Sequence, residues 1–429
     1  EQDDEGNWFL TGEKIFVTSG HGRYHLVIAR TKDPTGSKDG MDGLDGLSLF
    51  LVETWRENEK GERERLAHIQ RVEEKLGHHA SATVTVEFDR TPGKLIGELG
   101  DGFHHMLLLM NNARIAVGFE ALGLSEAAWR LARDYAAERT SMGKTIDRHE
   151  LVAEMLDEMQ TDIQGIRALA MRAAVSTENL NRQNIQLQYM EKEGTPEHEA
   201  LARKLKAMKR RLRRVTPLVK YLASEKSVEI SRRCMQVHGG CGYTREYGAE
   251  KLLRDSLVLP IYEGTSQIQA LMATKDNLQA VVGNPGLFFR QMGDSWRRSW
   301  SARDPLERRV AGIRYMAQSA LRTLLTRLIK DKWKGSRSES DQNLKEIFTQ
   351  WDPKTDFAPA LLHAERLTRI LADAEVCEAL WEQAKKWEKR RPVLERYLER
   401  AEPRCADELN RIQRTGERLL LDLRTREAA

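Results

Sequence analysis

The hydrophobic period of the chain changes once, near Gly102, and this change limits the folds that the chain can adopt. Before Gly102, apolar and polar residues alternate, which is typical of half-buried strands; the clearest example is Ala82, Val84, Val86 and Phe88. Three further segments show a similar pattern: residues 8–18, 24–30 and 47–53. Beyond Gly102, apolar residues recur every three or four positions. The chain is therefore predicted to begin as a β domain and to continue as helices.

Two apolar stripes with helical spacing follow this change. They are Val117, Ala121, Leu124, Ala128, Leu131 and Tyr135, and then Val152, Met155, Met159, Ile163, Ile166 and Ala170. Such stripes are the buried faces of a helical bundle. Residues 176–198 are polar, which indicates a loop or an exposed helix end. Thr216-Pro217 has the pattern of an N-cap followed by proline at the first helical position, so a helix is predicted to begin there.

The run Gly283-Asn284-Pro285-Gly286 is expected to end the bundle. The predicted fold class is α+β multidomain, with a β-barrel or sandwich-like domain in residues 1–99, a four-helix bundle in residues 100–282 and a C-terminal helical extension in residues 287–429. Six of the nine tryptophans lie in the extension, and so many large rings are expected to be buried in a folded domain. One apolar stripe there places Cys377 in a core; it consists of Leu367, Ile370, Ala374, Cys377 and Trp381.

Charge and cysteine usage exclude several classes of protein. The 69 basic and 65 acidic residues give a net charge of +4, which does not indicate a nucleic-acid partner. The four cysteines form no Cys-x-x-Cys pair, so no metal site is expected, and their scatter fits a reducing compartment such as the cytoplasm. Eight of the twelve residues Arg203–Arg214 are basic. That run could meet a membrane surface or nucleic acid, but a solvated helix face is favoured because acidic residues lie just upstream.

The stretch Met235–Gln269 is the most informative about chemistry. It contains a Gly-Gly-x-Gly turn at Gly239–Gly242, which either lets main-chain amides approach a phosphate or makes a tight turn between helices. It also contains Glu263, within Tyr-Glu-Gly-Thr. A glutamate at this place is either a solvated surface group or a carboxylate facing a cleft. The residues alone leave both alternatives open.

Residues Gln236–Gln269 closely resemble the C-terminal signature of the acyl-CoA dehydrogenase family. The glycine turn, the Arg254-Asp255 step and the Tyr-Glu-Gly-Thr element occur in the family's order and spacing. The resemblance implies that Glu263 is the catalytic base. In some family members the base lies elsewhere, at a position that is Ala113 here, and alanine cannot accept a proton.

Three further segments support this resemblance. Leu10–Gly20 is similar to the strand that contacts the flavin, and the matching residues are Phe16 and Thr18, with Phe16 in place of the usual tryptophan. Glu73–Asp89 resembles the last strands of the same domain. Ala136–Ile146 resembles the element that binds the flavin's diphosphate end across a subunit interface; Met142 replaces an aromatic residue there.

The resemblance also implies the rest of the site. FAD would be bound by Phe16, Thr18, Arg139, Ser141, Gln236, Gly239, Gly240, Thr265 and Gln267. The acyl-CoA substrate would be bound by Asn111, Arg114 and Tyr262. No metal is implied.

The match covers Leu10 to Gln279, and the long helical region that follows resembles one branch of the family. That branch has a C-terminal helical extension and includes methylmercaptopropionyl-CoA and broad-range fatty acyl-CoA dehydrogenases. The family's N-terminal helical domain has no counterpart in these residues. The expected activity is FAD-dependent α,β-dehydrogenation of an acyl-CoA to the trans-2-enoyl-CoA in fatty acid β-oxidation. Electrons would pass to electron-transfer flavoprotein or a similar acceptor, and the protein would be a homodimer or a higher homo-oligomer. An oxygen-using acyl-CoA oxidase and a non-catalytic helical scaffold remain the alternatives.

Overall fold

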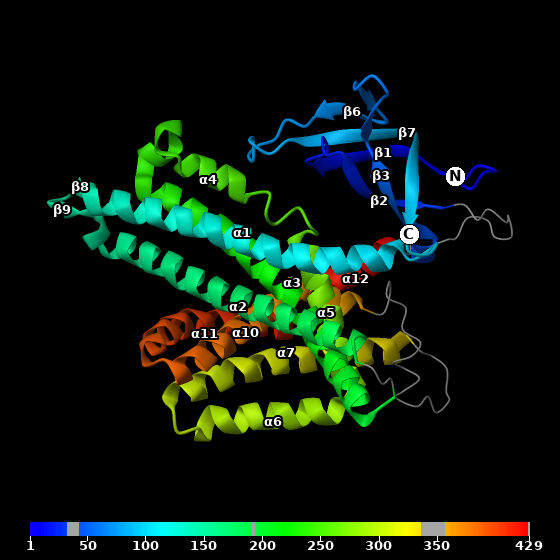
Figure 1. Cartoon of the computed structure of the whole chain (residues 1–429). Helices are drawn as coiled ribbons and strands as arrows, with labels where there is room; N and C mark the ends of the chain where they lie inside the picture. Colours follow the sequence, from blue (N-terminus) through cyan, green and yellow to red (C-terminus); the bar gives the residue numbers. More distant parts are fainter. Residues whose placement is uncertain (32–42, 191–193, 336–356, 428–429) are drawn as a thin grey trace. The chain divides into compact units, whose positions relative to one another are not determined.

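The computed structural model describes residues 1–31, 43–190, 194–335 and 357–427 (Figure 1). The chain divides into two compact units, Glu1–Ala113 and Arg114–Ala429. The first contains all the long strands, and the second contains most of the helices. The predicted three-part division stays a prediction.

The first unit contains an antiparallel five-stranded sheet. Its strand order is β1-β7-β3-β2, and β6 also pairs with β7. The strands are β1 (Trp8–Thr18), β2 (Tyr24–Arg30), β3 (Leu47–Glu53), β6 (Ala67–Val72) and β7 (Thr83–Ile96); a separate small hairpin consists of β4 (Trp55–Glu57) and β5 (Arg63–Arg65). The three strands predicted from residues 8–18, 24–30 and 47–53 are confirmed, and the alternating segment near Val84 is the first part of β7.

The core of this sheet explains why its strands alternate. Val84, Val86 and Phe88 of β7 are buried, as the period of two requires. The ring of Trp8 packs against Phe50 with the ring centroids 5.4 Å apart. At Gly93 a β-carbon would lie 2.4 Å from Leu10 Cδ1, so no larger residue fits at this point of β7 without displacing the core.

The second unit begins with a helical bundle. Its helices are α1 (Gly102–Glu138), α2 (Glu150–Gln188), α3 (Pro196–His238), α4 (Ala249–Ser256) and α5 (Ser266–Gly283); a small hairpin of β8 (Thr140–Ser141) and β9 (Lys144–Thr145) joins α1 to α2. By length and composition α1 could cross a membrane. However, its residues Ala121, Ala128 and Ala132 are fully buried, and Tyr135 stacks on His238 of α3 at 4.3 Å. From Arg114 onward α1 therefore has the packing of a core helix.

The predicted helix start at Thr216-Pro217 is wrong. Helix α3 starts at Pro196, after Thr195, whose hydroxyl accepts a hydrogen bond from the His198 amide at 3.3 Å. Pro217 lies inside the helix, and the Thr216 hydroxyl donates to the Leu212 carbonyl at 2.9 Å. Proline lacks one helical hydrogen bond, but residues 215–224 are all buried, and this packing keeps the helix continuous. Within the polar segment 176–198, α2 continues to Gln188 as an exposed helix end.

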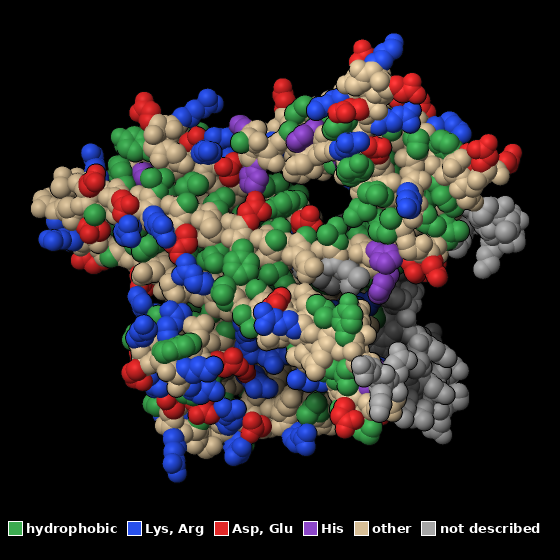
Figure 2. All heavy atoms as spheres, in the orientation of Figure 1, with side chains coloured by type: hydrophobic (Ala, Val, Ile, Leu, Met, Phe, Trp, Pro, Cys, Tyr) green, Lys and Arg blue, Asp and Glu red, His purple; other side chains and the backbone are tan. Residues whose placement is uncertain are grey.

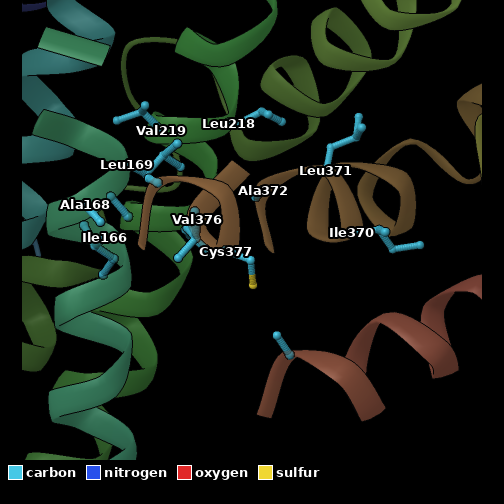
Figure 3. Close-up of a cluster of buried hydrophobic side chains, with 14 of the residues drawn as sticks. Ile166, Ala168, Leu169, Leu218, Val219, Ile370, Leu371, Ala372, Val376 and Cys377 are labelled. Atoms are coloured by element: carbon cyan, nitrogen blue, oxygen red, sulfur yellow. The ribbon is translucent and has the colours of Figure 1, made fainter. Parts of the chain in front are cut away.

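The C-terminal region is helical and packs on the bundle. It contains α6 (Pro285–Ser301), α7 (Pro305–Gly335), α9 (Ala358–Leu361), α10 (Ala364–Lys386), α11 (Arg391–Arg414) and α12 (Glu417–Glu427). The predicted break is confirmed, because Asn284 Oδ1 caps α6 through the Leu287 amide at 3.0 Å. Figure 3 shows side chains of α2, α3 and α10 in one apolar cluster that includes Leu169, Val219 and Cys377. Cys377 is therefore a core residue, as predicted.

A buried carboxylate lies within this C-terminal region. Asp373 of α10 accepts hydrogen bonds from the Tyr397 hydroxyl at 2.7 Å and from Arg404 at 2.7 and 2.8 Å. Burial opposes ionisation of Asp373, but the charge of Arg404 and these bonds outweigh it and hold its pKa below the usual range. The Tyr397 ring fills the space beside Gly165 of α2, where a β-carbon would lie 2.4 Å from Tyr397 Cε2.

The expectation that the tryptophans of this region are buried is wrong for three of them. Trp296 is 55% exposed, Trp300 76% and Trp387 53%. Trp296 and Trp300 lie on α6, which packs chiefly against α7, and Trp387 follows the last turn of α10. Figure 1 shows α6 at the edge of this unit, on the far side of α7 from α2. In the described part of the chain no further layer covers these rings.

Candidate active site

Glu263 lies in the turn between α4 and α5, and its backbone is strained. Its φ is +54°, and that of Gly264 is +84°. The left-handed region is uncommon for residues other than glycine, and such strain persists only where surrounding contacts hold it. The buried Gln269 supplies these contacts, because its Nε2 donates to the carbonyls of Glu263 and Gly264 at 3.2 Å each.

The start of α5 fixes this turn on the bundle. The Thr265 hydroxyl caps the helix by accepting from the Ile268 amide at 3.3 Å. The Ser266 hydroxyl donates to Glu225 of α3 at 2.5 Å. The side chain of Glu263 itself is exposed. These contacts thus hold the backbone of the turn, while the Glu263 carboxylate is open to a ligand.

Two buried cations lie close enough to Glu263 to feel its charge. They are Arg114 of α1, which is 2% exposed, and Lys220 of α3, which is 0% exposed. Burial lowers the pKa of Lys220 to about 8, although the charges of Glu225 and Glu263 oppose this shift. Burial also lowers the pKa of Arg114, and the charges of Glu263 and Asp276 oppose this shift. Two buried cations therefore share this part of the bundle with the carboxylates of Glu225, Glu263 and Asp276.

Tyr262 is fixed beside the carboxylate. Its hydroxyl donates a hydrogen bond to Glu120 of α1. Burial raises the pKa of Tyr262, and the bond to Glu120 and the charge of Glu263 raise it further, so the phenol stays neutral. Tyr262 therefore places a neutral aromatic side chain next to Glu263.

A second group of predicted residues meets at the glycine turn after α3. Gly239 and Gly240 are exposed, and β-carbons built on them meet nothing within 4 Å, so a ligand can approach their backbone. Hydrogen bonds from Tyr135 and Tyr247 lower the pKa of the Cys241 thiol; burial opposes this shift, and the charge of Arg139 adds to it. Arg139, at the end of α1, thus lies near the turn. Gln236, in the last turn of α3, is exposed, and this residue with Arg139 and the amides of the turn suits an anionic diphosphate; Ser141 of β8 is also exposed.

The remaining predicted site residues are Phe16, Thr18, Asn111, Thr265 and Gln267. Phe16 and Thr18 are exposed residues of β1 in the first unit. The side chain of Asn111 lies outside the described residues. The Gln267 amide donates to Glu365 of α10 at 2.9 Å, and Thr265 caps α5, so both of these side chains already have internal partners. The cofactor and substrate roles of all these residues stay predictions.

Sequence reasoning missed three residues of the site. Lys220 has the same helical spacing as the buried residues Thr216 and Ser224, and a charged residue on a buried helix face is the signal that could have revealed it. Gln269 follows Glu263 by six positions, and no local pattern distinguishes a buried glutamine that bonds the turn from a surface glutamine. Glu120 lies on α1, far from Tyr262 in sequence, so only the fold reveals that contact.

The fold and comparisons with known proteins agree. The structure of ACDH-11 from Caenorhabditis elegans in complex with C11-CoA has a TM-score of 0.67 and 23% identity, and the match covers 95% of this chain and 60% of that one. An acyl-CoA dehydrogenase from Bacillus anthracis complexed with FAD has a TM-score of 0.70 and 18% identity, covering 98% of this chain and 67% of that one. The fold is thus of the acyl-CoA dehydrogenase class, a β half-barrel followed by helical domains.

Sequence comparisons show similarity to the same family. Residues 100–193 and 198–277 match the acyl-CoA dehydrogenase C-terminal domain. The 3-methylmercaptopropionyl-CoA dehydrogenase of Ruegeria pomeroyi is 34% identical over 284 residues, which are 62% of this chain and 44% of that protein. An acyl-CoA dehydrogenase of Bacillus subtilis is 31% identical over 273 residues, 63% of this chain and 61% of that protein. The matched residues are similar to the acyl-CoA dehydrogenase family, and the two matches cover 44% and 61% of the length of these relatives.

Proposed function

We propose that the chain carries the catalytic base for α,β-dehydrogenation of an acyl-CoA thioester. The observation that carries this proposal is the strained turn at Glu263, which presents an exposed carboxylate on a backbone held by Gln269. Glu263 takes the proton from the α-carbon, and the hydride leaves the β-carbon as the trans double bond forms. Bound FAD would supply the hydride acceptor, which protein side chains cannot provide.

The chain's own residues divide the remaining work. A positioned general base contributes about 10²–10⁴-fold to the rate of proton transfer, and this role belongs to Glu263. The Glu263 amide is the proposed donor to the thioester carbonyl, where negative charge develops. Tyr262 and Arg114 are the proposed substrate contacts beside this turn, with Asn111 as a further proposed contact. The neutral phenol of Tyr262 adds no charge beside the acyl chain.

Cofactor binding is proposed at the glycine turn and on β1. Arg139, Ser141 and Gln236 would hold the diphosphate and adenylate half of FAD, with the backbone of Gly239 and Gly240. Phe16 and Thr18 would contact the flavin ring, and Thr265 and Gln267 would give up their internal partners to contact the cofactor. The diphosphate contacts favour FAD over FMN, and the relative complexed with FAD supports this assignment.

The wider biological setting is also a proposal. The proposed family branch is the one that includes the 3-methylmercaptopropionyl-CoA dehydrogenase named above, and the helical region after Gly286 supports this proposal. We assign the chain to acyl-CoA oxidation in the cytoplasm, as a homodimer or higher homo-oligomer that passes electrons to electron-transfer flavoprotein or a similar acceptor. Its four cysteines are free thiols, as a reducing compartment would keep them.

Replacing the base tests this proposal. Glu263→Gln keeps the size of the side chain but cannot accept a proton, so the flavin-loaded variant should still bind acyl-CoA while flavin bleaching slows about 100-fold or more. Glu246→Gln, at an exposed carboxylate on the same segment, is the matched control and should bleach at the wild-type rate. Equal bleaching by Glu263→Gln and the wild type would refute the mechanism. Anaerobic bleaching without peroxide production in air would separate a dehydrogenase from an oxidase.

A further inference from the structure

An exposed apolar stripe runs along one face of α2. Met171 is 49% exposed, Val175 53%, Ile185 55% and Tyr189, which ends the helix, 81%. Their spacing of four, ten and four residues keeps them on one side of the helix, over a length of about 27 Å. Between them lie Glu178 and Arg182, which form an ion pair with each other at 2.7 Å.

The stripe borders a groove that contains an exposed tryptophan. Met171 and Val175 line this groove together with Arg211 of α3, and with Lys386 and Trp387 at the end of α10. An adjoining groove shares Met171 and Trp387 and continues to Lys389 and Arg390. We call the α2 stripe together with these two grooves the docking face. The docking face joins three helices of one compact unit.

The rim of the docking face is positively charged. Among the described residues, Arg211, Lys386 and Lys389 form no ion pair, and all three are exposed. The acidic Glu382 of this rim is paired with Arg172 at 3.3 Å. Figure 2 shows that Lys and Arg side chains are numerous over the part of the visible face that carries α6, α10 and α11. An apolar stripe therefore lies between cations that have no acidic partner within the described chain.

We propose that the docking face binds an anionic lipid surface. Trp387 and Tyr189 have the amphipathic rings that favour the boundary between water and lipid, and Arg211, Lys386 and Lys389 would meet headgroup phosphates. A run of basic residues on α3 is by itself best explained as a solvated face, but the structure places one of its members beside exposed apolar side chains. Binding of nucleic acid would give no role to Met171, Val175 and Ile185. The inference is independent of the proposed acyl-CoA chemistry.

Vesicle sedimentation tests the proposal without any turnover. The purified chain should sediment with vesicles of phosphatidylcholine mixed with phosphatidylglycerol and should stay in the supernatant with phosphatidylcholine alone. High salt should release it, because screening weakens the contacts to headgroups. Reversing three charges on the docking face, with Arg211→Glu, Lys386→Glu and Lys389→Glu, should lower the partition coefficient by at least about tenfold.

A matched triple variant separates this face from net charge. Lys206→Glu, Lys209→Glu and Arg210→Glu change the same number of exposed cations around a different groove, and this variant should retain most of the binding. Trp387→Ser should weaken binding with the charge unchanged. Equal loss of vesicle binding in both triple variants, or full vesicle binding by Trp387→Ser, would overturn the proposal.

Two further outcomes would also reject the lipid assignment. If duplex DNA bound as tightly as the anionic vesicles, and if binding did not depend on Trp387, the surface would be a general polyanion site. Light scattering could instead show a dimer that Trp387→Ser dissociates, with no vesicle binding by the wild type; the occupant would then be a second copy of the chain. Melting temperatures of all variants within the wild-type range confirm that folding is intact.

Discussion

The ionisation of Lys220 depends on the fold. It is fully buried, and its Nζ has no hydrogen-bond partner among the described residues. Burial lowers its pKa from 10.5 to about 8, so the folded state releases the proton more readily than the unfolded chain does. The unfolded state therefore binds more protons between these two values, and stability should rise with pH in that window.

Lys220→Met should remove this pH dependence. In the wild type the free energy of unfolding should increase between about pH 8 and pH 10, by at most about 1.4 kcal/mol per pH unit from this group, and should fall as pH drops through 8. The variant should gain stability at neutral pH, because a buried charge is replaced by an apolar side chain. Thermal melts of both proteins across this range measure the effect. Lys204→Met, at an exposed position of the same helix, should keep the wild-type profile, and parallel profiles for Lys220→Met would contradict the prediction.

At the residue scale the sequence predicts a candidate base at Glu263, but it does not predict the contacts that hold the turn around it. Glu263 could be predicted because its neighbours match a family motif. Its left-handed backbone and the two hydrogen bonds from Gln269 could not be predicted, since they arise only when α5 folds back on the turn. Lys220 was missed because charged residues are rarely fully buried.

Single elements show where local signals succeed. The bounds of β1, β2 and β3 could be predicted because alternation is a property of each strand by itself. The Thr216-Pro217 signal failed because buried packing on several sides of α3 overrides a local preference. The end of the bundle at Asn284 was predictable because its cap uses only neighbouring residues.

The turn before α5 depends on Gln269. Gln269→Leu removes both hydrogen bonds to the carbonyls of Glu263 and Gly264, so the strained turn should relax. We expect flavin reduction by acyl-CoA to slow about tenfold and unfolding free energy to fall by about 1–3 kcal/mol. Stopped-flow bleaching and thermal melts test this. The control is Gln279→Leu, at an exposed position of α5. If the flavin of Gln269→Leu bleached at the wild-type rate, the two hydrogen bonds from Gln269 would not be needed for the reaction.

The end of α1 supplies the cation for the glycine turn. Arg139→Ala should lower flavin occupancy several-fold while leaving the melting temperature of the flavin-free chain nearly unchanged, since Arg139 is exposed. The ratio of flavin to protein absorbance measures occupancy. Arg133→Ala, at an exposed arginine that pairs with Asp134 and lies over the Trp129 ring, is the matched control. Full flavin content in Arg139→Ala would count against the diphosphate assignment.

At the scale of the whole molecule, the C-terminal region is part of the bundle's structure. Arg396 and Arg400 of α11 pair with Asp157 of α2 at 3.3 and 2.8 Å, across more than 230 residues of sequence. The helical character of this region could be predicted from its apolar stripe. Its packing against α2 could not be predicted, because ion pairs between residues so far apart in the sequence leave no periodic signal. For the same reason the exposure of Trp387 was not foreseen.

A shared core predicts cooperative unfolding of the second unit. Asp373 is the counter-charge of Arg404, and both lie where α10 and α11 meet near Tyr397, whose ring packs against Gly165 of α2. Asp373→Asn keeps the shape but leaves the arginine without a charged partner, which should destabilise the unit by about 3–5 kcal/mol. Because the pKa of Asp373 is held below 3.8, its contribution is present above that value and is lost as pH falls through the folded pKa.

The melting curve of Asp373→Asn decides whether the bundle and the C-terminal helices unfold together. Since α10 shares apolar contacts with α2 and α3, the substitution should move one transition to lower temperature rather than create a second one. Asp407→Asn, at an exposed aspartate of α11 paired with Arg411, should shift the curve by no more than about 1 kcal/mol. Calorimetry gives the number of transitions directly. If α10 and α11 melted alone while helical signal from the bundle persisted, the C-terminal region would be an independent domain and the shared core would not be the source of its stability.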